Sequence, residues 1–79
     1  MTIYQIKQIS TDIYASFDDE LKIKMAQQQF AYPLDEDHTI RTWLMKNANF
    51  PYVIKENVRY HCIMFIDESD AIAFKLRWM

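Results

Sequence analysis

The densest group of polar side chains is the run Asp35-Glu36-Asp37-His38. Carboxylates and an imidazole together can bind a metal ion or transfer protons. A helix is expected to begin at Asp35, and on a helix only residues three or four positions apart share a face, so Asp35 and His38 have usable spacing. Acidic residues are also typical of a helix start, where they face the positive end of the helix dipole. We therefore predict a capped helix start, with a metal-assisted enzyme built on Asp35, Asp37 and His38 as an alternative.

A second acidic group, Asp67, Glu68 and Asp70, has the same two interpretations. Asp67 can accept a hydrogen bond from the backbone N–H of Ser69 or Asp70, and Glu68 and Asp70 then lie in the first turn of a helix. The helix start thus accounts for all three carboxylates. The chain also contains no glycine, which excludes Gly-rich phosphate loops and the calcium loop of helix–loop–helix proteins.

His61 and Cys62 are neighbours on a predicted strand, so their side chains point to opposite faces and cannot form a nucleophile–base pair. Cys62 is expected to pack as a small apolar residue. The serine and threonine residues lack the glycines that a nucleophile elbow needs. We therefore predict a protein that is not an enzyme, with no catalytic residue, cofactor or metal.

Composition indicates one small globular domain over residues 1–79, since the chain has 79 residues and 51% of them are hydrophobic. The net charge of −2, with both signs interspersed, argues against a nucleic-acid partner. Arg59, His61 and Phe65 nevertheless share one face of a predicted strand, and an exposed aromatic on a sheet can stack on bases. A weak single-stranded nucleic-acid binder that uses this face is a second alternative.

The chain has a single cysteine, so no internal disulfide can form, and a reducing cytoplasmic location is the expectation. It has no apolar run long enough to cross a membrane and no basic, apolar leader at its start. We therefore expect no membrane association.

Periodicity predicts three strands and three helices in the order β-α-α-β-β-α. The strands are expected at 2–9, 52–55 and 58–66, and the helices at 12–30, from Asp35 to Asn47, and 68–78. A rival interpretation starts the first helix near residue 18, with Ser16 as its cap. We expect Glu56-Asn57 to form a tight turn, Asn57 to tolerate a positive φ, and the first strand to pair with the strand at 58–66. The predicted fold is a two-layer α+β sandwich with a three-stranded sheet.

The last predicted helix is apolar on two sides. Ala71, Phe74 and Trp78 form one stripe, and the other stripe consists of Ile72, Leu76 and Met79. Both stripes can pack inside the domain, or one of them can contact a partner. The residues that we predict to bind a partner are Met45, Ala71, Phe74, Lys75 and Trp78.

The ending F-I-D-E-S-D-A-I-A-F-K-L-R-W resembles the C-terminus of small tailed-bacteriophage proteins, in which an acidic turn precedes a D-A-x-x-F-K-L-x-W helix. The matching positions are Asp70, Ala71, Phe74, Lys75, Leu76 and Trp78. The resemblance covers about a quarter of the chain and brings no site residues with it. It implies the cytoplasm of an infected bacterium, where small phage proteins often bind or inhibit host enzymes. We therefore predict a non-enzymatic protein-interaction module, a phage accessory protein that binds a host or phage protein or forms a homodimer.

Overall fold

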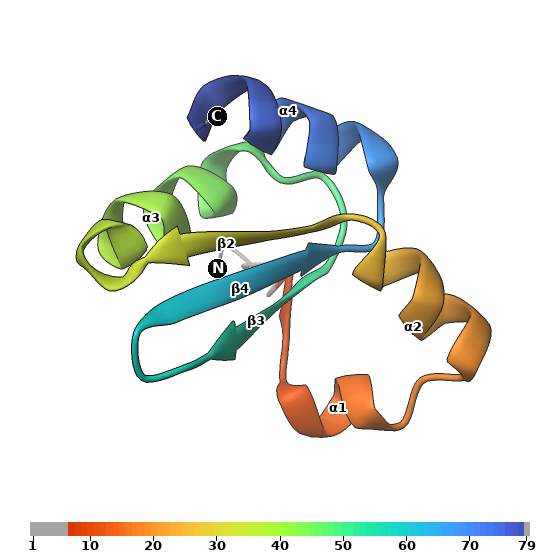
Figure 1. Cartoon of the computed structure of the whole chain (residues 1–79). Helices are drawn as coiled ribbons and strands as arrows, with labels where there is room; N and C mark the ends of the chain where they lie inside the picture. Colours follow the sequence, from red (N-terminus) through yellow and green to blue (C-terminus); the bar gives the residue numbers. More distant parts are fainter. Residues whose placement is uncertain (1–6, 79) are drawn as a thin grey trace, which may run out of the picture.

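The computed structural model describes residues 7–78 and contains a four-stranded mixed sheet with helices on both faces (Figure 1). The strands are β1 (Gln8–Ile9), β2 (Gln29–Pro33), β3 (Tyr52–Glu56) and β4 (Tyr60–Phe65). The helices are α1 (Thr11–Ala15), α2 (Asp19–Ala26), α3 (Asp37–Asn47) and α4 (Glu68–Trp78), and a short 3-10 helix, η1 (Leu34–Glu36), joins β2 to α3. The strand order is β1-β3-β4-β2, in which β1 is parallel to β3 and the other pairs are antiparallel.

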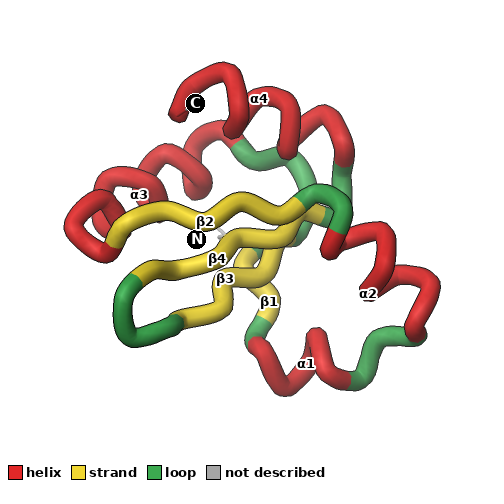
Figure 2. Tube along the Cα trace, viewed as in Figure 1, coloured by secondary structure: helices red, strands yellow, loops and turns green. Residues whose placement is uncertain are grey.

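The two faces of the sheet carry separate apolar cores. Figures 1 and 2 show α3 and α4 together over one face, and α1 and α2 below the other. Ile63 and Phe65 of β4 belong to the core under α3 and α4, while Met64 belongs to the core under α1 and α2. All three are buried, because alternate side chains of a strand point to opposite faces. This end of β4 is therefore covered on both sides.

The segment predicted as one helix over residues 12–30 contains two helices, α1 and α2. Ser10 caps α1, with its hydroxyl oxygen accepting from the N–H of Ile13 at 3.2 Å, and Asp18 caps α2 by accepting from the N–H of Leu21 at 2.8 Å. Ser16 ends α1 and does not cap the helix that follows. Tyr14 of α1, Phe17 between the helices, and Leu21 and Met25 of α2 pack on the same core, whereas Ile13 is exposed. The four-residue apolar spacing that suggested one long helix therefore continues across a break between two helices.

Residues 29–33, which we expected at the end of that helix, form the additional strand β2. Phe30 and Tyr32 point to the core under α3 and α4, and they alternate with the exposed residues Gln29, Ala31 and Pro33. This period of two is the pattern of a half-buried strand. The predicted α+β class is confirmed, but the two-layer sandwich of three strands and three helices is wrong. The domain has four strands and four α-helices over residues 7–78, and helices cover both faces of its sheet.

Smaller corrections concern pairing and turns. β1 pairs with β3, so the predicted pairing of the first strand with the strand at 58–66 is wrong. Residues 2–6 of the predicted first strand lie outside the described residues. α3 begins at Asp37 and not directly after Asp35. Between residues 7 and 78 no residue has a positive φ, so Asn57 is not in the left-handed region that we expected. No helix within the described chain has the length and apolar character needed to span a membrane.

Candidate functional site

Two of the predicted partner-binding residues lie in the core. Phe74 is 0% exposed, and its ring centroid lies 5.4 Å from that of Phe30 and 5.5 Å from that of Phe65. Ala71 is also buried, and Trp78 packs partly buried against the same cluster. This stripe of α4 is therefore the inner one, and a partner cannot reach Phe74 while the domain stays folded.

The other apolar stripe of α4 faces outward. Leu76 is 81% exposed and Ile72 is 51% exposed, and Lys75 between them is exposed as well. Met45 of α3 is 70% exposed. Of the five predicted residues, Met45 and Lys75 are thus exposed, and Ile72 and Leu76 are the exposed apolar side chains of α4.

The strand face proposed for nucleic acid is covered. Phe65 is fully buried under α3 and α4. His61 is partly buried, and its Nδ1 lies 2.8 Å from Oδ1 of Asp37. The predicted surface of Arg59, His61 and Phe65 is therefore wrong, because two of its three side chains point into the domain.

Asp37 is the centre of a polar network between α3 and the sheet. Its carboxylate accepts hydrogen bonds from the hydroxyl of Tyr32 (2.7 Å) and from Nε of Arg41 (2.9 and 2.8 Å), in addition to its contact with His61. Arg41 also donates to Oε1 of Glu56 at 2.8 Å. These contacts join α3 to β2, β3 and β4, and a further bond from Arg41 reaches Gln8 of β1 at 3.2 Å.

The electrostatics of Asp37 follow from these contacts. Partial burial raises the pKa of the Asp37 carboxyl, but the hydrogen bonds from Tyr32, His61 and Arg41 outweigh this effect and the net pKa is lowered. Burial, together with the hydrogen bond to Asp37, raises the pKa of Tyr32. An ionised Asp37 that accepts from three side chains anchors the start of α3 and is not held ready to transfer a proton.

Asp35 and His38 are not part of this network. Both are exposed, and within residues 7–78 no three His, Cys, Asp or Glu side chains are grouped so that they could hold a metal ion. The metal site proposed on Asp35, Asp37 and His38 is therefore not formed. Sequence reasoning missed the contact of Asp37 with Tyr32 and His61, because it depends on the pairing of β2 with β4, which no local pattern in the sequence shows.

Cys62 lies on the opposite face of β4 from His61. Its Sγ donates to Oε1 of Gln29 at 3.3 Å. Burial raises the pKa of the Cys62 thiol, and the nearby Lys55 only partly offsets this. A protonated, partly buried thiol is a weak nucleophile, in keeping with the expectation that Cys62 packs as a small residue.

The strand β2 lies at one edge of the sheet, and its hydrogen bonds determine which backbone groups point outward. The N–H of Phe65 donates to the carbonyl oxygen of Gln28 at 3.3 Å. In an antiparallel pair, residues that exchange hydrogen bonds alternate with residues that do not, so the backbone groups of Phe30 and Tyr32 also point to β4. The residues whose N–H and C=O groups point away from β4 are Gln29, Ala31 and Pro33. We call these groups the outer edge of β2.

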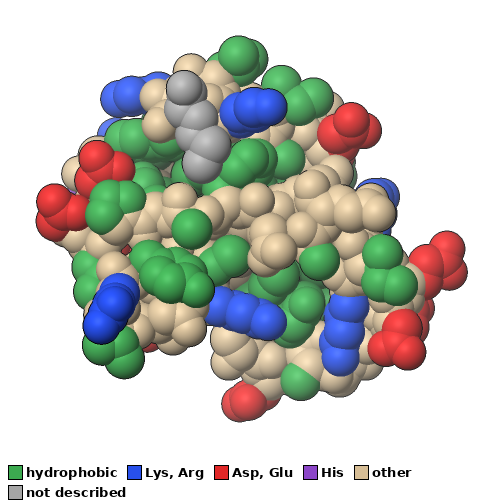
Figure 3. Space-filling view, viewed as in Figure 1, with side chains coloured by type: hydrophobic (Ala, Val, Ile, Leu, Met, Phe, Trp, Pro, Cys, Tyr) green, Lys and Arg blue, Asp and Glu red, His purple; other side chains and the backbone are tan. Residues whose placement is uncertain are grey.

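The outer edge of β2 is accessible and uncharged. Gln29, Ala31 and Pro33 are exposed, and the sequence Q-F-A-Y-P has no charged residue. In Figure 3, backbone and uncharged polar atoms (tan) run across the middle of the molecule, along the path of β2 in Figure 1. Edge strands of stable monomers are commonly protected by charged side chains. Pro33 fits this position because the N–H that it lacks would point outward.

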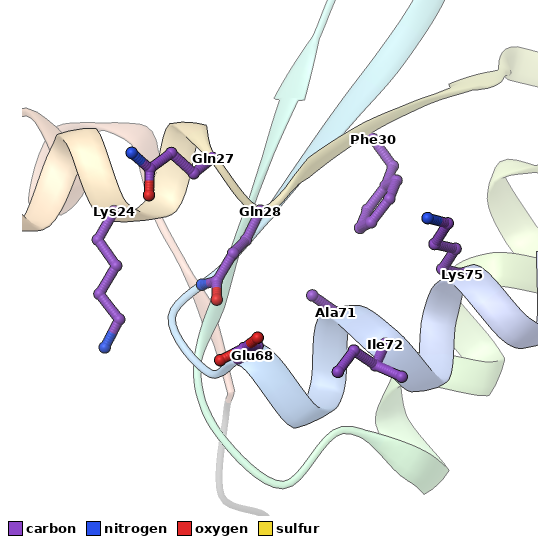
Figure 4. Close-up of a pocket in the computed structure, with 8 residues that line it drawn as sticks. All are labelled: Lys24, Gln27, Gln28, Phe30, Glu68, Ala71, Ile72 and Lys75. Atoms are coloured by element: carbon purple, nitrogen blue, oxygen red, sulfur yellow. The ribbon is translucent and has the colours of Figure 1, made fainter.

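A groove of about 400 Å³ runs beside β2, between α2 and α4. Figure 4 shows Phe30 pointing from β2 toward α4, where Ala71 and Lys75 face it, while Lys24 and Gln27 come from α2 on the other side. The groove thus has an apolar floor with a lysine on each wall. Glu68 also lines it.

Charged side chains lie near both ends of β2. Lys24 and Glu68 line the groove beside the start of the strand, and Lys75 lies past Phe30, further along the strand (Figure 4). Asp35 and Glu36 follow its end in η1, and both are exposed. Figure 3 shows acidic side chains at the left end of the tan band. A strand that pairs with β2 therefore meets both signs of charge in the groove and acidic side chains beyond the end of β2.

Comparison with known proteins gives no match to a protein-family model, to a curated protein or to a solved structure.

Proposed function

We propose that this protein is a non-enzymatic interaction module that binds another polypeptide by adding a strand to the outer edge of β2. The observation that carries the proposal is the set of outward-pointing backbone groups of Gln29, Ala31 and Pro33, which have no strand partner within residues 7–78. Strand addition uses such groups for affinity, and it uses neighbouring pockets for specificity.

The groove beside β2 supplies the specificity. An extended segment paired with β2 places alternate side chains over the α3 and α4 side of the sheet, where Phe30 and Ile72 offer apolar contact. Lys24 and Lys75 can pair with acidic side chains on that segment, and Glu68 can pair with a basic one.

The setting that we propose is that of a phage accessory protein. Its support is the resemblance of the ending D-A-I-A-F-K-L-R-W to small phage proteins. In that setting the bound polypeptide is a host or phage protein whose activity is altered by the contact, or a second copy of this chain.

The experiment that tests the proposed surface is the variant Ala31→Pro. It removes an outward N–H and leaves the hydrogen bonds between β2 and β4 intact, because the N–H of Ala31 does not point to β4. Thr11→Pro is the matched control: it places the same residue at the first position of α1, where proline is tolerated, on an element away from β2.

Tagged wild-type protein and both variants are used to capture proteins from bacterial lysate, and each is checked for a cooperative thermal transition. We expect wild type and Thr11→Pro to retain the same stoichiometric partner and Ala31→Pro to lose it while remaining folded. A partner retained equally by all three proteins would show that the outer edge of β2 is not the binding surface.

A further inference from the structure

We propose that the sheet face opposite α3 and α4 binds single-stranded nucleic acid, with a base stacked on Tyr60 and phosphates beside Lys55 and Lys22. This is a binding activity beyond the proposed function, and it does not depend on strand addition at β2. It uses the face of the sheet that α1 and α2 leave partly uncovered, not the buried face of His61 and Phe65.

The helices α1 and α2 cover only part of their face of the sheet. Their core includes Val53 of β3 and Met64 of β4. Toward the β3–β4 hairpin, the side chains that alternate onto the same face are exposed or only partly buried. We call these residues the open face: Ala31 and Pro33 of β2, Lys55 of β3, and Tyr60 and Cys62 of β4.

Tyr60 is the aromatic side chain of the open face, and it is 47% exposed. Its partner across the strands is Pro33, and the next row of the face has the small side chains of Ala31 and Cys62. A flat ring can therefore approach Tyr60 without meeting a bulky neighbour from β2. Aromatic side chains exposed on a sheet stack on unpaired bases, which a duplex does not offer.

Lys55 lies close to Tyr60 on this face. It pairs with Cys62, two residues after Tyr60, so it is the diagonal neighbour of Tyr60, at a Cα separation of roughly 7–8 Å. A base stacked on Tyr60 therefore has a cation within reach of its own phosphate.

A second lysine converges on the same place. Nζ of Lys55 lies 5.0 Å from the ring centroid of Tyr14, and Nζ of Lys22 lies 5.7 Å from it. Lys22 also donates to the carbonyl oxygen of Ala15 at 3.0 Å, which holds its side chain in place. Within residues 7–78 neither lysine forms an ion pair with a carboxylate. Cations beside an exposed aromatic side chain match the phosphates and bases of a single strand.

The net charge of −2 is unevenly distributed over the protein. None of the residues of the open face is acidic. Asp37 and Glu56 pair with Arg41 on the other side of the sheet, and Asp18 caps α2. In Figure 3, basic side chains (blue) lie with hydrophobic ones (green) below the tan band, whereas acidic ones (red) lie at the rim. Repulsion from distant carboxylates is screened beyond about 10 Å at 0.1 M salt.

The chemistry of the open face favours nucleic acid over a polypeptide. The backbone N–H and C=O groups of β3 and β4 point along the sheet and not out of its face, so a polypeptide lying on this face gains no backbone hydrogen bonds from them. A nucleic-acid strand instead supplies a ring for Tyr60 and an anionic group for each lysine.

The test is fluorescence anisotropy with labelled oligothymidylate and oligouridylate of about ten nucleotides, a length that fills one binding site. At low salt we expect wild type to bind both. Tyr60→Ala should bind about five- to hundredfold more weakly, because one stacking contact is lost, while Tyr60→Phe should retain binding. Lys55→Gln should weaken binding and reduce the slope of log affinity against log salt by about 0.7, since one phosphate contact is lost.

The matched controls are Phe50→Ala and Lys46→Gln. Phe50 is an aromatic residue of similar exposure, at 50%, in the loop after α3, and Lys46 is an exposed lysine of α3. Each variant is checked for a cooperative thermal transition, and both controls should bind as wild type does.

Three outcomes would overturn this inference. The first is that wild type binds neither oligonucleotide at low salt, where phosphate contacts are strongest; loss of a captured protein by Tyr60→Ala would then assign the open face to a polypeptide. The second is that the controls lose as much affinity as Tyr60→Ala and Lys55→Gln. The third is that a duplex of the same length competes as well as the single strand, because stacking on Tyr60 requires an unpaired base.

Discussion

The contrast between Phe74 and Leu76 gives the sharpest test of how α4 is oriented. The two residues are two positions apart on the same helix, yet Phe74 is 0% exposed and Leu76 is 81% exposed. Truncating a fully buried phenylalanine to alanine costs about 3–5 kcal/mol in free energy of unfolding. Truncating an exposed leucine on a helix changes it by less than about 0.5 kcal/mol.

The structure places Phe74→Ala at the upper part of that range. Its ring contacts those of Phe30, Phe65, Trp43 and Trp78, with centroid separations between 5.4 and 6.4 Å, and such aromatic pairs contribute about 0.5–1.5 kcal/mol each beyond their buried area. A domain of this length has a total stability of about 4–12 kcal/mol. Phe74→Ala therefore removes a large part of it.

The assay is equilibrium unfolding in urea, followed by far-ultraviolet circular dichroism and by the fluorescence of Trp43 and Trp78. Wild type, Phe74→Ala and Leu76→Ala are compared at one protein concentration, because association of the folded state also stabilises it. We expect the midpoint to fall strongly for Phe74→Ala and to stay within error for Leu76→Ala. Equal losses for both variants, or a loss below about 1 kcal/mol for Phe74→Ala, would refute the assignment of the inner and outer stripes.

Three further predictions concern carboxylates. Asp37→Asn should lower the free energy of unfolding by about 1–3 kcal/mol at neutral pH. Because the pKa of Asp37 is lowered in the folded protein, its stabilisation is present above the unfolded pKa of about 3.9 and is lost as pH falls through the folded pKa. Urea unfolding of both proteins near pH 3 should therefore show a smaller difference than at neutral pH, and an equal difference at both pH values would contradict this. Asp70→Ala should lower the free energy of unfolding, measured by calorimetry, by about 2–4 kcal/mol. The buried Asp70 carboxylate accepts hydrogen bonds from the backbone N–H of Asn49 at 3.1 Å and of Phe50 at 2.9 Å. A loss below about 1 kcal/mol would show that these bonds do not hold the loop after α3. Asp18→Ala should lower the free energy of unfolding by about 1 kcal/mol, because α2 loses its N-terminal cap. Asp18→Asn should retain most of the stability in the same thermal melt. Equal losses for the two variants would argue against the cap.

The outer edge of β2 could not be identified from the sequence. The residues Q-F-A-Y-P follow a helical segment, and the proline indicated only where a helix must stop. Their alternation became informative only through pairing with β4, which lies about thirty residues further along the chain. Recognition of an edge requires the order of strands in the sheet, and that order is not a local property.

The elements that the sequence determined are those stabilised by neighbours along the chain. α4 spans Glu68–Trp78, as predicted, and Oδ2 of Asp67 accepts from the N–H of Asp70 at 3.1 Å, as predicted. The cap, the acidic first turn and the basic last turn act over one or two helical turns, so their effect can be read directly from adjacent residues.

Tertiary structure alone decided which side of α4 is buried and which polar residues meet. Both stripes of the helix are apolar, and the choice of Phe74 over Leu76 depends on the rings of Phe30, Trp43 and Phe65 from three other elements. Asp37 likewise meets His61 only because β4 passes under the start of α3. Burial and long-range hydrogen bonds depend on the summed packing of distant segments, whereas helix caps and strand alternation depend on a few consecutive residues.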